Sequence, residues 1–443
     1  MATKTKNIRV VSLLKTTDPS CQRHLRQLFL RGETASGRVE QSVRDILAQV
    51  KQRGDRAVCD YTQMFDRVRT TPQTLAISAT ETEAAFTQLS RADRTALQTA
   101  AKRITAFHRK QRQASWSYRD DLGVTLGQRI APLHRVGVYV PGGKAAYPSS
   151  VLMNVIPAKV AGVKEIIVVS PPSPQGYHPG ILAAAHLAGA DAFFRVGGAQ
   201  AVAALAYGTK TIPRVDKIVG PGNIYVATAK RLVFGQVDID MIAGPSEVLV
   251  IADDSASPRD VAADMLSQAE HDEQAAPLCI TTSESLATAI VQAITDQLMH
   301  LQRSSIASAS MRQQGAVIVA RNKTEVIELA NAIAPEHLEL AVKNPRSWLP
   351  DIHHAGAIFL GHLSTEPFGD YIAGPNHVLP TGGAARFSSP LGVYDFLKRT
   401  NIIEASPRAI KTLGPHIVRL ATMEGLEAHA RAVQYRLNGA NHA

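Results

Sequence analysis

The fold is decided by residues 135–170, which read RVGVYVPGGKAAYPSSVLMNVIPAKVAGVKEIIVVS. Two short β-rich runs, residues 136–140 and 165–170, flank a helical run at residues 151–161. Strands that are joined through a helix pair in parallel, because a parallel pair needs a long crossover connection. These residues therefore predict one strand–helix–strand unit of a parallel sheet.

The same alternation continues toward the C-terminus. Helical runs follow at residues 181–188, 200–207 and 223–234. The further strands predicted are residues 192–196, 217–219, 247–252, 278–282, 316–320 and 355–360. Together with the first two, these strands exceed one mononucleotide-binding half, so the pattern predicts an α/β fold of two units that divide near residues 240–245.

The first third of the chain has a different residue pattern. Residues 41–66 predict a helix because apolar side chains recur at helical spacing. Ser78 and Glu81 form a capping-box pattern before a second helical run. Residues 1–129 are therefore expected to form a mostly helical, polar region.

The net charge of +10 is unevenly distributed. Residues 1–129 hold 23 Lys and Arg against 12 Asp and Glu, whereas the remainder holds 25 against 26. A basic region can bind nucleic acid. Because no nucleic-acid motif accompanies the charge, and acidic residues alternate with basic ones, a solvated surface without a nucleic-acid partner is the favoured interpretation.

Composition also indicates the compartment. No apolar run approaches the roughly 20 residues of a transmembrane helix, and the N-terminus lacks the apolar core of a signal peptide. The cysteines Cys21, Cys59 and Cys279 are few and far apart, so they do not form a disulfide framework. Cys279, within an apolar run, is expected to be a core thiol. We expect a soluble, cytoplasmic protein with no membrane partner.

Gly-rich turns lie at residues 141–144, 197–200, 220–223 and 244–247. Ligands of open parallel sheets bind beyond the carboxyl ends of the strands, so these turns are expected to carry the chemistry. None completes a nucleotide fingerprint. Val138 stands where a phosphate loop before Gly143-Lys144 needs glycine, and Tyr225 stands where the dinucleotide motif after Gly220 needs one. Tight turn geometry and dinucleotide binding both remain open for these glycines.

Ten of the fifteen histidines lie from His271 onward. Gln268 and His271 are three residues apart and share a helix face, which Glu270 does not. Imidazole and carboxylate ligands suit zinc, and also cobalt or manganese. A single histidine is more often structural, and neutral glutamine is an unusual zinc ligand. Spacing alone therefore makes a metal site plausible without establishing one.

The chain resembles the histidinol dehydrogenase family over residues 30 to 437. The resemblance rests on long blocks in the same order, namely RVGVYVPGGKAAYPSSVLMNVIPAKVAG, VGGAQAVAALAYGT, VGPGNIYVATAKR, AGPSEVLVIAD, LSQAEHD, APEHLEL, GDYIAGPNHVLPT and MEGLEAHARAV. It implies a zinc-dependent enzyme that oxidises L-histidinol to L-histidinaldehyde and then to L-histidine, reducing two NAD⁺. It also implies one Zn²⁺ per subunit and a homodimer with shared active sites.

The resemblance further implies two Rossmann-like parallel-sheet domains that lack the GxGxxG fingerprint. The expected domains are residues 130–243, which contact NAD, and residues 244–385, which carry the zinc and acid–base residues. Residues 1–129 are expected to pack on the second of these units. Residues 386–443 are expected to form a small extension exchanged between the subunits of the dimer.

The resemblance also implies roles for single residues, at the positions of this sequence that match the family's motifs. The implied zinc ligands are Gln268, His271, Asp370 and, from the other subunit, His429. The implied substrate-binding residues are Ser246, Gln268, His271, His337, Asp370, His377, Glu424 and His429. The implied NAD-contacting residues are Tyr139, Gln200 and Asn223. The family's zinc holds the imidazole and amino group of the substrate, so it orients the reacting alcohol.

Glu336 and His337 match the family's catalytic acid–base pair. Alcohol oxidation needs a base for the hydroxyl proton while the hydride leaves, and histidine suits neutral pH. The aldehyde must gain water before a second hydride can leave, and a carboxylate can deprotonate that water. We therefore assign the proton of the substrate oxygen to His337 and water activation to Glu336. The structural alternative is that the pair only caps or braces a helix after Pro335.

Two other functions compete with this interpretation. A relative within the family could oxidise another polar alcohol, such as a sulfonated diol; the match at Ser246, His377, Glu424 and His429 argues against it. A basic, non-catalytic metal-binding or nucleic-acid-binding protein would have no reason to keep the Glu336–His337 pair together with the four ligands.

Overall fold

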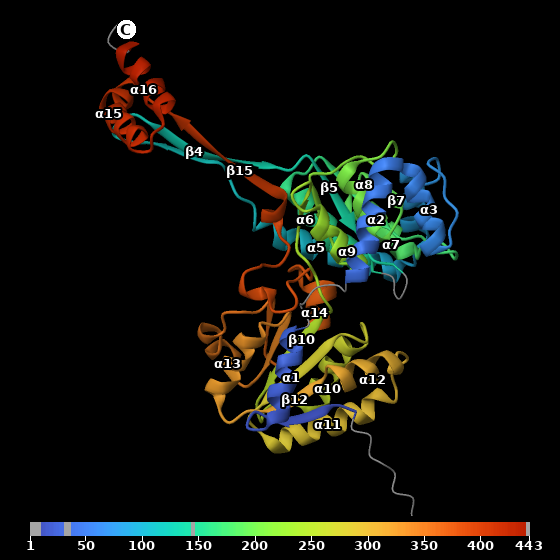
Figure 1. Cartoon of the computed structure of the whole chain (residues 1–443). Helices are drawn as coiled ribbons and strands as arrows, with labels where there is room; N and C mark the ends of the chain where they lie inside the picture. Colours follow the sequence, from blue (N-terminus) through green and yellow to red (C-terminus); the bar gives the residue numbers. More distant parts are fainter. Residues whose placement is uncertain (1–9, 31–36, 143–146, 440–443) are drawn as a thin grey trace, which may run out of the picture.

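The computed structural model describes residues 10–30, 37–142 and 147–439 (Figure 1). The turn residues Gly143 and Lys144 lie outside these ranges. Two parallel sheets, each covered by helices, form the two α/β units, and a long ribbon carries the C-terminal helices away from them (Figure 1). In the part of the chain that the structure describes, no helix is both long and apolar enough to cross a lipid bilayer.

The first sheet has six strands in the order β2-β7-β6-β5-β8-β9. Their bounds are β2 (Ala76–Ile77), β7 (Ala192–Arg195), β6 (Glu165–Ser170), β5 (Arg135–Tyr139), β8 (Lys217–Val219) and β9 (Asp238–Ile239). All neighbours pair in parallel except β2, which runs antiparallel to β7. From β7 to β9 the order is that of a nucleotide-binding sheet, with the first strand, β5, in the middle.

The second sheet repeats this order, and all its neighbours are parallel. Its strands are β1 (Ser12–Lys15), β12 (Ala316–Val319), β11 (Ala276–Thr281), β10 (Glu247–Ala252), β13 (His337–Ala341) and β14 (Ala357–Leu360). Every residue of β10, β11 and β13 is buried, as expected for strands that are covered on both faces. Two of the six strands, β1 and β13, were not predicted from the sequence.

Helices connect the strands on both faces of each sheet. In the first unit they are α6 (Pro148–Ala161), α7 (Pro179–Ala188), α8 (Gly198–Tyr207) and α9 (Ile224–Val233). In the second they are α10 (Pro258–Ala269), α11 (Glu284–Leu298), α12 (Ser304–Gln313) and α13 (Lys323–Ile333). The parallel α/β architecture predicted from residues 135–170 is therefore confirmed. Cys279 is fully buried in β11, as predicted, and burial raises its pKa to about 12.

The N-terminal helices divide between the two units. Helix α1 (Pro19–Phe29) packs on the second unit, and β1 extends that sheet. Helices α2 (Gly37–Arg53), α3 (Asp55–Asp66), α4 (Ala79–Gln88) and α5 (Arg91–Arg109) pack instead on the helices of the first unit. The expectation that residues 1–129 pack on the second unit is therefore wrong for α2 to α5. Helical periodicity identifies an apolar stripe without indicating which sheet it covers.

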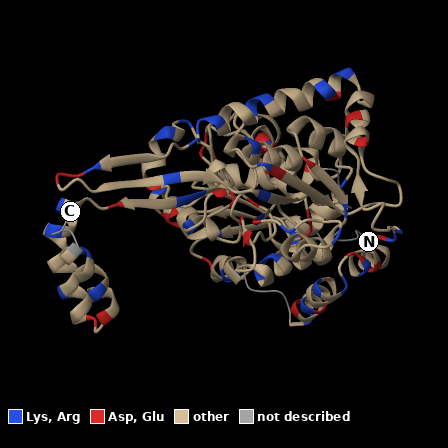
Figure 2. Ribbon diagram, turned by 90° about the horizontal axis from the view of Figure 1, so that it is seen from above, with Lys and Arg blue, Asp and Glu red and all other residues tan. Residues whose placement is uncertain are grey.

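Two predictions for this region have different outcomes in the structure. The capping box of Ser78 and Glu81 is present at the start of α4. The single helix expected over residues 41–66 is two helices, because α2 ends at Arg53 and Gly54 adopts a φ of 55° before α3 begins. Lys and Arg residues are interspersed with Asp and Glu over the helices and the ribbon (Figure 2).

The ribbon is a three-stranded antiparallel sheet in the order β15-β4-β3. It consists of β3 (Trp116–Arg119), β4 (Thr125–Pro132) and β15 (Leu397–Glu404), and it leads to α15 (Pro407–Met423) and α16 (Glu427–Gly439). The hairpin of α15 and α16 lies at the far end of the ribbon, away from both units (Figure 1). Residues of β3 and β15 are largely exposed, so this part of the chain lacks a core of its own.

Candidate active site

The candidate catalytic residues lie at the amino ends of the strands of the second sheet. His337 is the first residue of β13, and Ser246 directly precedes β10. Helix α10 returns to this edge and places Gln268 near its C-terminus, with His271 just beyond it. The expectation that the turn at residues 244–247 lies at a carboxyl edge is therefore wrong, because that turn leads into β10.

The backbone of Glu247 holds both members of the acid–base pair. Its N–H donates a hydrogen bond to Oε2 of Glu336 (2.9 Å), and its carbonyl oxygen lies 3.0 Å from Nδ1 of His337. A carbonyl can only accept, so Nδ1 of His337 carries the proton. In the neutral ring, Nε2 is then the atom that can accept a proton. The pair belongs to the start of a strand, so it does not cap a helix.

Buried carboxylates surround this imidazole. Nδ1 of His337 lies 3.7 Å from Oε2 of Glu336, and Nε2 lies 3.5 Å from Oδ1 of Asp370. Burial raises the pKa of Glu336 to about 8, a value suited to proton exchange near neutral pH. Burial lowers the pKa of His337, but the nearby carboxylates outweigh it and hold that pKa well above its usual value.

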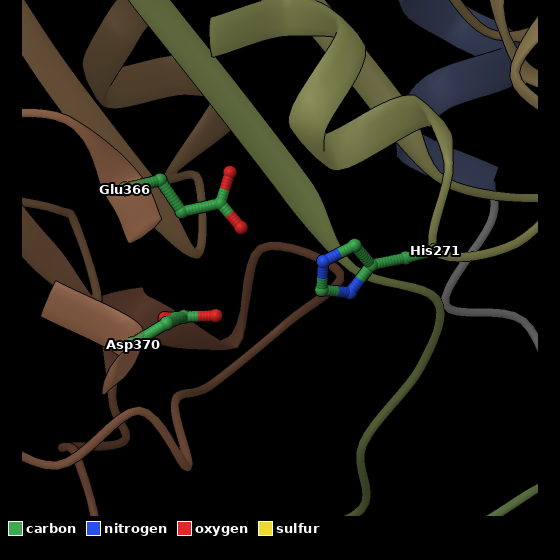
Figure 3. A group of neighbouring side chains, drawn as sticks. All are labelled: His271, Glu366 and Asp370. Carbon is green, nitrogen blue, oxygen red and sulfur yellow. The ribbon is translucent and has the colours of Figure 1, made fainter. Parts of the chain in front are cut away.

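A group of possible metal ligands lies beside the pair (Figure 3). One ligand atom each of His271, Glu366 and Asp370 lies within 4.8 Å of the others. The three side chains come from different segments: the turn after α10, the short helix α14 (Glu366–Phe368) and the π-helical segment Gly369–Ala373 that follows it. Burial lowers the pKa of His271, which favours the neutral imidazole that a metal requires.

Gln268 adds a fourth polar group to this place. It is fully buried, and both atoms of its amide lack a hydrogen-bond partner among the described residues. Buried amides are rarely left unpaired, so a ligand is the simplest account of this one. One helical turn separates Gln268 from His271. The donor set of imidazole, carboxylates and amide fits a divalent cation such as Zn²⁺.

Sequence reasoning missed Glu366. It is 1 % exposed, and its backbone N–H donates to Oε1 of Glu339 (2.6 Å) while Ser267 Oγ approaches its carboxylate at 3.4 Å. The only local signal was its position four residues before Asp370, in a segment without a recognisable element. Nothing in that spacing shows that the carboxylate turns inward.

The segment after Asp370 connects the site to the first unit. Nδ1 of His377 donates to the backbone oxygen of Asp370 (3.0 Å), so its imidazole lies against the metal-ligand segment. The amide of Asn376 donates to the backbone oxygen of Met153 in α6 (2.6 Å). Ser246 lies partly exposed at the start of the same edge. Five of the predicted substrate residues are thus brought together within one chain, namely Gln268, His271, His337, Asp370 and His377.

Glu424 and His429 are not brought to this place. Both are exposed at the junction of α15 and α16. That hairpin lies at the end of the ribbon, remote from α10 and α14 (Figure 1). Within one chain, therefore, the ligand set implied by the family resemblance is incomplete.

The predicted NAD contacts all lie at the carboxyl edge of the first sheet. Tyr139 ends β5, and its hydroxyl accepts a hydrogen bond from the N–H of Gly198 at the start of α8 (3.0 Å). Gln200 is 1 % exposed, and its amide has no partner among the described residues. Asn223 caps α9 by accepting hydrogen bonds from Tyr225 and Val226.

A parallel sheet of the nucleotide-binding type, joined to a unit that carries a buried His–carboxylate pair, fits the class of NAD-dependent dehydrogenases. The comparisons with known proteins agree, since a family profile described as histidinol dehydrogenase matches residues 30–437. The chain therefore belongs to the histidinol dehydrogenase family.

Similar proteins cover nearly the whole chain. Histidinol dehydrogenase of Syntrophotalea carbinolica is 55 % identical over 428 residues, which is 97 % of this chain and 99 % of that protein. Histidinol dehydrogenase of Aquifex aeolicus is 53 % identical, with 96 % and 99 % covered. The crystal structure of histidinol dehydrogenase from Elizabethkingia anophelis superposes with a TM-score of 0.91 at 37 % identity, covering 98 % of this chain and 99 % of that one.

Proposed function

We propose that the protein is a zinc-dependent L-histidinol dehydrogenase that performs the final steps of histidine biosynthesis. It would oxidise L-histidinol through L-histidinaldehyde to L-histidine and reduce two NAD⁺. The observation that carries this proposal is the position of His337, held between Glu336 and Asp370 beside the group of His271 and Glu366. A proton-accepting site and a cation site thus share one carboxylate.

In the first oxidation, Nε2 of His337 takes the proton of the substrate hydroxyl while the carbon transfers a hydride to NAD⁺. Nδ1 cannot compete for this role, because it donates to the carbonyl of Glu247. The products are the aldehyde, NADH and one proton. The fixed orientation of the ring keeps the accepting nitrogen directed toward Asp370 and the cation site.

In the second oxidation, water adds to the aldehyde and forms a geminal diol, whose carbon can lose a hydride. Glu336 takes a proton from that water, while His337 returns to the aldehyde oxygen the proton that it took in the first oxidation. A pKa of about 8 makes Glu336 able to accept and release a proton near neutral pH. His337 takes the hydroxyl proton of the diol as the second hydride leaves. The products are the carboxylate, a second NADH and two protons.

The proposed cation ligands are Gln268, His271 and Asp370, with His429 from a second subunit; Glu366 lies close enough to contribute. When bound, the cation would supply positive charge that orients the substrate. It would also offset the carboxylate charge around His337 and so favour the neutral ring, whose Nε2 can accept a proton. The unpartnered amide of Gln268 supports its inclusion. The substrate imidazole and amino group fit a site of this kind, since both are nitrogen ligands.

We further propose a homodimer in which the α15–α16 hairpin of one subunit completes the site of the other. The support is the remote position of His429 and Glu424 on an extended ribbon. Helices α15 and α16 and the turn between them also expose large apolar side chains, namely Leu413, Ile417, Leu420, Met423, Leu426 and Tyr435. Such a surface is typical of a subunit interface.

A cytoplasmic location is part of the proposal, because the reaction consumes NAD⁺ and the cysteines Cys21, Cys59 and Cys279 are unpaired. The test is NAD⁺ reduction, followed as NADH absorbance, with L-histidinol as substrate. We expect two NADH per histidinol, and loss of activity with a chelator that added Zn²⁺ restores. Absence of NADH formation with histidinol, alongside activity on another polar alcohol, would overturn the substrate assignment.

A further inference from the structure

Helix α3 ends beside the proposed dinucleotide site. Its first residue, Asp55, accepts a hydrogen bond from the hydroxyl of Thr211 (2.9 Å), just beyond the C-terminal end of α8. Helix α3 contacts α8 and starts at its C-terminal end, so the last residue of α3, Asp66, is directed away from that end. The other end of α8 is the helix start at Gly198, where the hydroxyl of Tyr139 is bound.

The electrostatics place Asp66 at the same edge of the first sheet. Burial raises the pKa of Tyr139 to about 12, and the negative charge of Asp66 adds to this increase. Burial also raises the pKa of Tyr177, and the same charge contributes there. The hydroxyl of Tyr177 donates to the backbone oxygen of Ser170 (2.7 Å), which ends β6. Asp66 therefore lies near the carboxyl edge of the first sheet, on the side where β5 and β6 end.

Asp66 occupies this position at a cost to stability. Its Oδ2 is buried and receives no hydrogen bond from any residue in the described ranges. It is the last residue of α3, where the helix dipole disfavours a negative charge. Arg67, which follows, has a φ of 57°, a left-handed conformation that is uncommon outside glycine. Unpartnered buried groups and strained backbone residues are concentrated at functional sites, where a bound ligand can supply the missing contacts.

Other polar groups at this edge also lack partners. Both amide atoms of Gln200 and the hydroxyl of Ser170 are buried without a hydrogen bond to any described residue. An amide can donate and accept, a hydroxyl can do both, and a carboxylate can only accept. The missing partner of Asp66 is therefore a donor, and a neutral donor such as a sugar hydroxyl satisfies it without bringing further charge.

The topology explains why a donor is expected here. In a dinucleotide-binding sheet, an acidic residue near the end of the second strand accepts a hydrogen bond from the ribose of NAD. The second strand of this sheet is β6, and the residues that follow it, 171–176, read PPSPQG and contain no acid. Asp66 is a carboxylate near this edge that comes from a different segment.

We propose that Asp66 accepts hydrogen bonds from the ribose hydroxyls of the adenosine half of NAD and so selects NAD over NADP. The proposal rests on NAD binding at the first sheet, as set out under the proposed function. A carboxylate binds a ribose diol and repels the 2′-phosphate of NADP. Asp66 is thus a specificity-determining residue contributed by the N-terminal helices.

The test measures dinucleotide binding directly, by calorimetric titration of the full-length protein without histidinol. Asp66→Asn keeps the size of the side chain and removes its charge. We expect its Kd for NAD⁺ to rise about 10-fold or more, the range of a hydrogen bond to a charged group. The preference for NAD⁺ over NADP⁺ should fall by at least as much. Wild type should also lose affinity for 2′-deoxy-NAD⁺, whereas Asp66→Asn should discriminate little between the two.

The matched control is Asp60→Asn, which removes the same charge from the same helix. Asp60 is exposed and pairs with Arg53, away from the sheet edge, so its substitution should leave dinucleotide affinity unchanged. Asp66→Asn should also raise the thermal unfolding temperature, because it removes an unfavourable charge. A lower unfolding temperature with unchanged NAD⁺ affinity would show a purely structural role and overturn the proposal.

The two proposals can fail separately. If wild type binds NAD⁺ but does not oxidise histidinol, the proposed function fails and the role of Asp66 is still decided by the titrations. If wild type oxidises histidinol while Asp66→Asn keeps full NAD⁺ affinity and selectivity, only the role of Asp66 is refuted. If wild type binds no NAD⁺, both are refuted.

Discussion

Nε2 of His337 lies 3.5 Å from Oδ1 of Asp370. The proposed proton acceptor thus borders a proposed metal ligand, so the charge of one affects the other. His337 begins a strand of the second sheet. Asp370 lies in a segment that is hydrogen-bonded to the first unit through Asn376. The contact therefore joins the acid–base pair, the cation site and the unit proposed to bind NAD.

The first prediction concerns His271. Replacing it with alanine removes the imidazole from the group that it forms with Glu366 and Asp370. We expect zinc affinity and histidinol oxidation to fall together, the latter by 100-fold or more, with folding retained. Metal analysis after dialysis measures the first and NADH formation the second. The control is His300→Ala at an exposed position. Full zinc content and normal activity in His271→Ala would refute the assignment.

The second prediction concerns Glu366, which the structure adds to the site. Glu366→Gln preserves size and removes the charge from a fully buried position. Groups that contact or support metal ligands typically change affinity by about 10- to 100-fold, so we expect zinc affinity to fall within this range. Competition with a chromophoric chelator measures it. Glu328→Gln, an exposed position on α13, serves as the control. Equal zinc affinity in Glu366→Gln and wild type would exclude Glu366 from the site.

The third prediction tests the shared site. His337→Ala and His429→Ala should each be inactive alone, because the first lacks the proton acceptor and the second lacks a residue proposed to act in the partner subunit. Mixed dimers should recover activity, since one of their two sites contains both histidines. Subunit exchange must be verified with differently tagged chains. Verified exchange without any activity would show that each site is built from one chain.

The alternation of strands and helices predicted the two sheets well, because buried parallel strands are continuous apolar runs. It missed β13, since the segment HLELA contains polar residues and follows Pro335 and Glu336. It missed β1 because a strand that joins a distant sheet carries no local sign of its partner. The ribbon strand β4, TLGQRIAP, was missed because its polar residues do not mark a buried face.

For the site too, the sequence predicted what depends on local spacing and missed what depends on contacts with distant residues. The shared face of Gln268 and His271 followed from helical spacing, and the remaining candidates came from the family resemblance. Glu366 could not be found in this way, because its burial depends on contacts with Glu339 and Ser267 from other elements. The edge of the sheet was also assigned wrongly for residues 244–247. A Gly-rich turn looks alike whether it enters or leaves a strand.

The fourth prediction follows from the pKa of Asp66. Burial raises this pKa to about 6, above the roughly 3.9 of an unfolded chain. The native state therefore keeps the proton to higher pH than the unfolded state, so stability falls as pH rises through about 4 to 6. Asp66→Asn should remove this contribution. The difference in unfolding temperature between variant and wild type, without NAD, should be small at pH 4 and larger in favour of the variant at pH 7. A difference that does not change with pH would contradict the environment described for Asp66.

The last prediction separates the roles of Glu336 and His337. Only the second oxidation adds water, so Glu336→Gln, which keeps the shape and loses the base, should slow oxidation of histidinaldehyde more than oxidation of histidinol. His337→Asn removes a proton acceptor that both steps use, so both should slow. Acid–base groups typically contribute about 10²- to 10⁴-fold, which sets the expected size of each loss. Stopped-flow NADH formation, started separately from the alcohol and from the aldehyde, measures the steps apart. Equal losses in both steps for Glu336→Gln would refute this division and leave Glu336 an electrostatic role, in which its carboxylate, 3.7 Å from the ring, raises the pKa of His337.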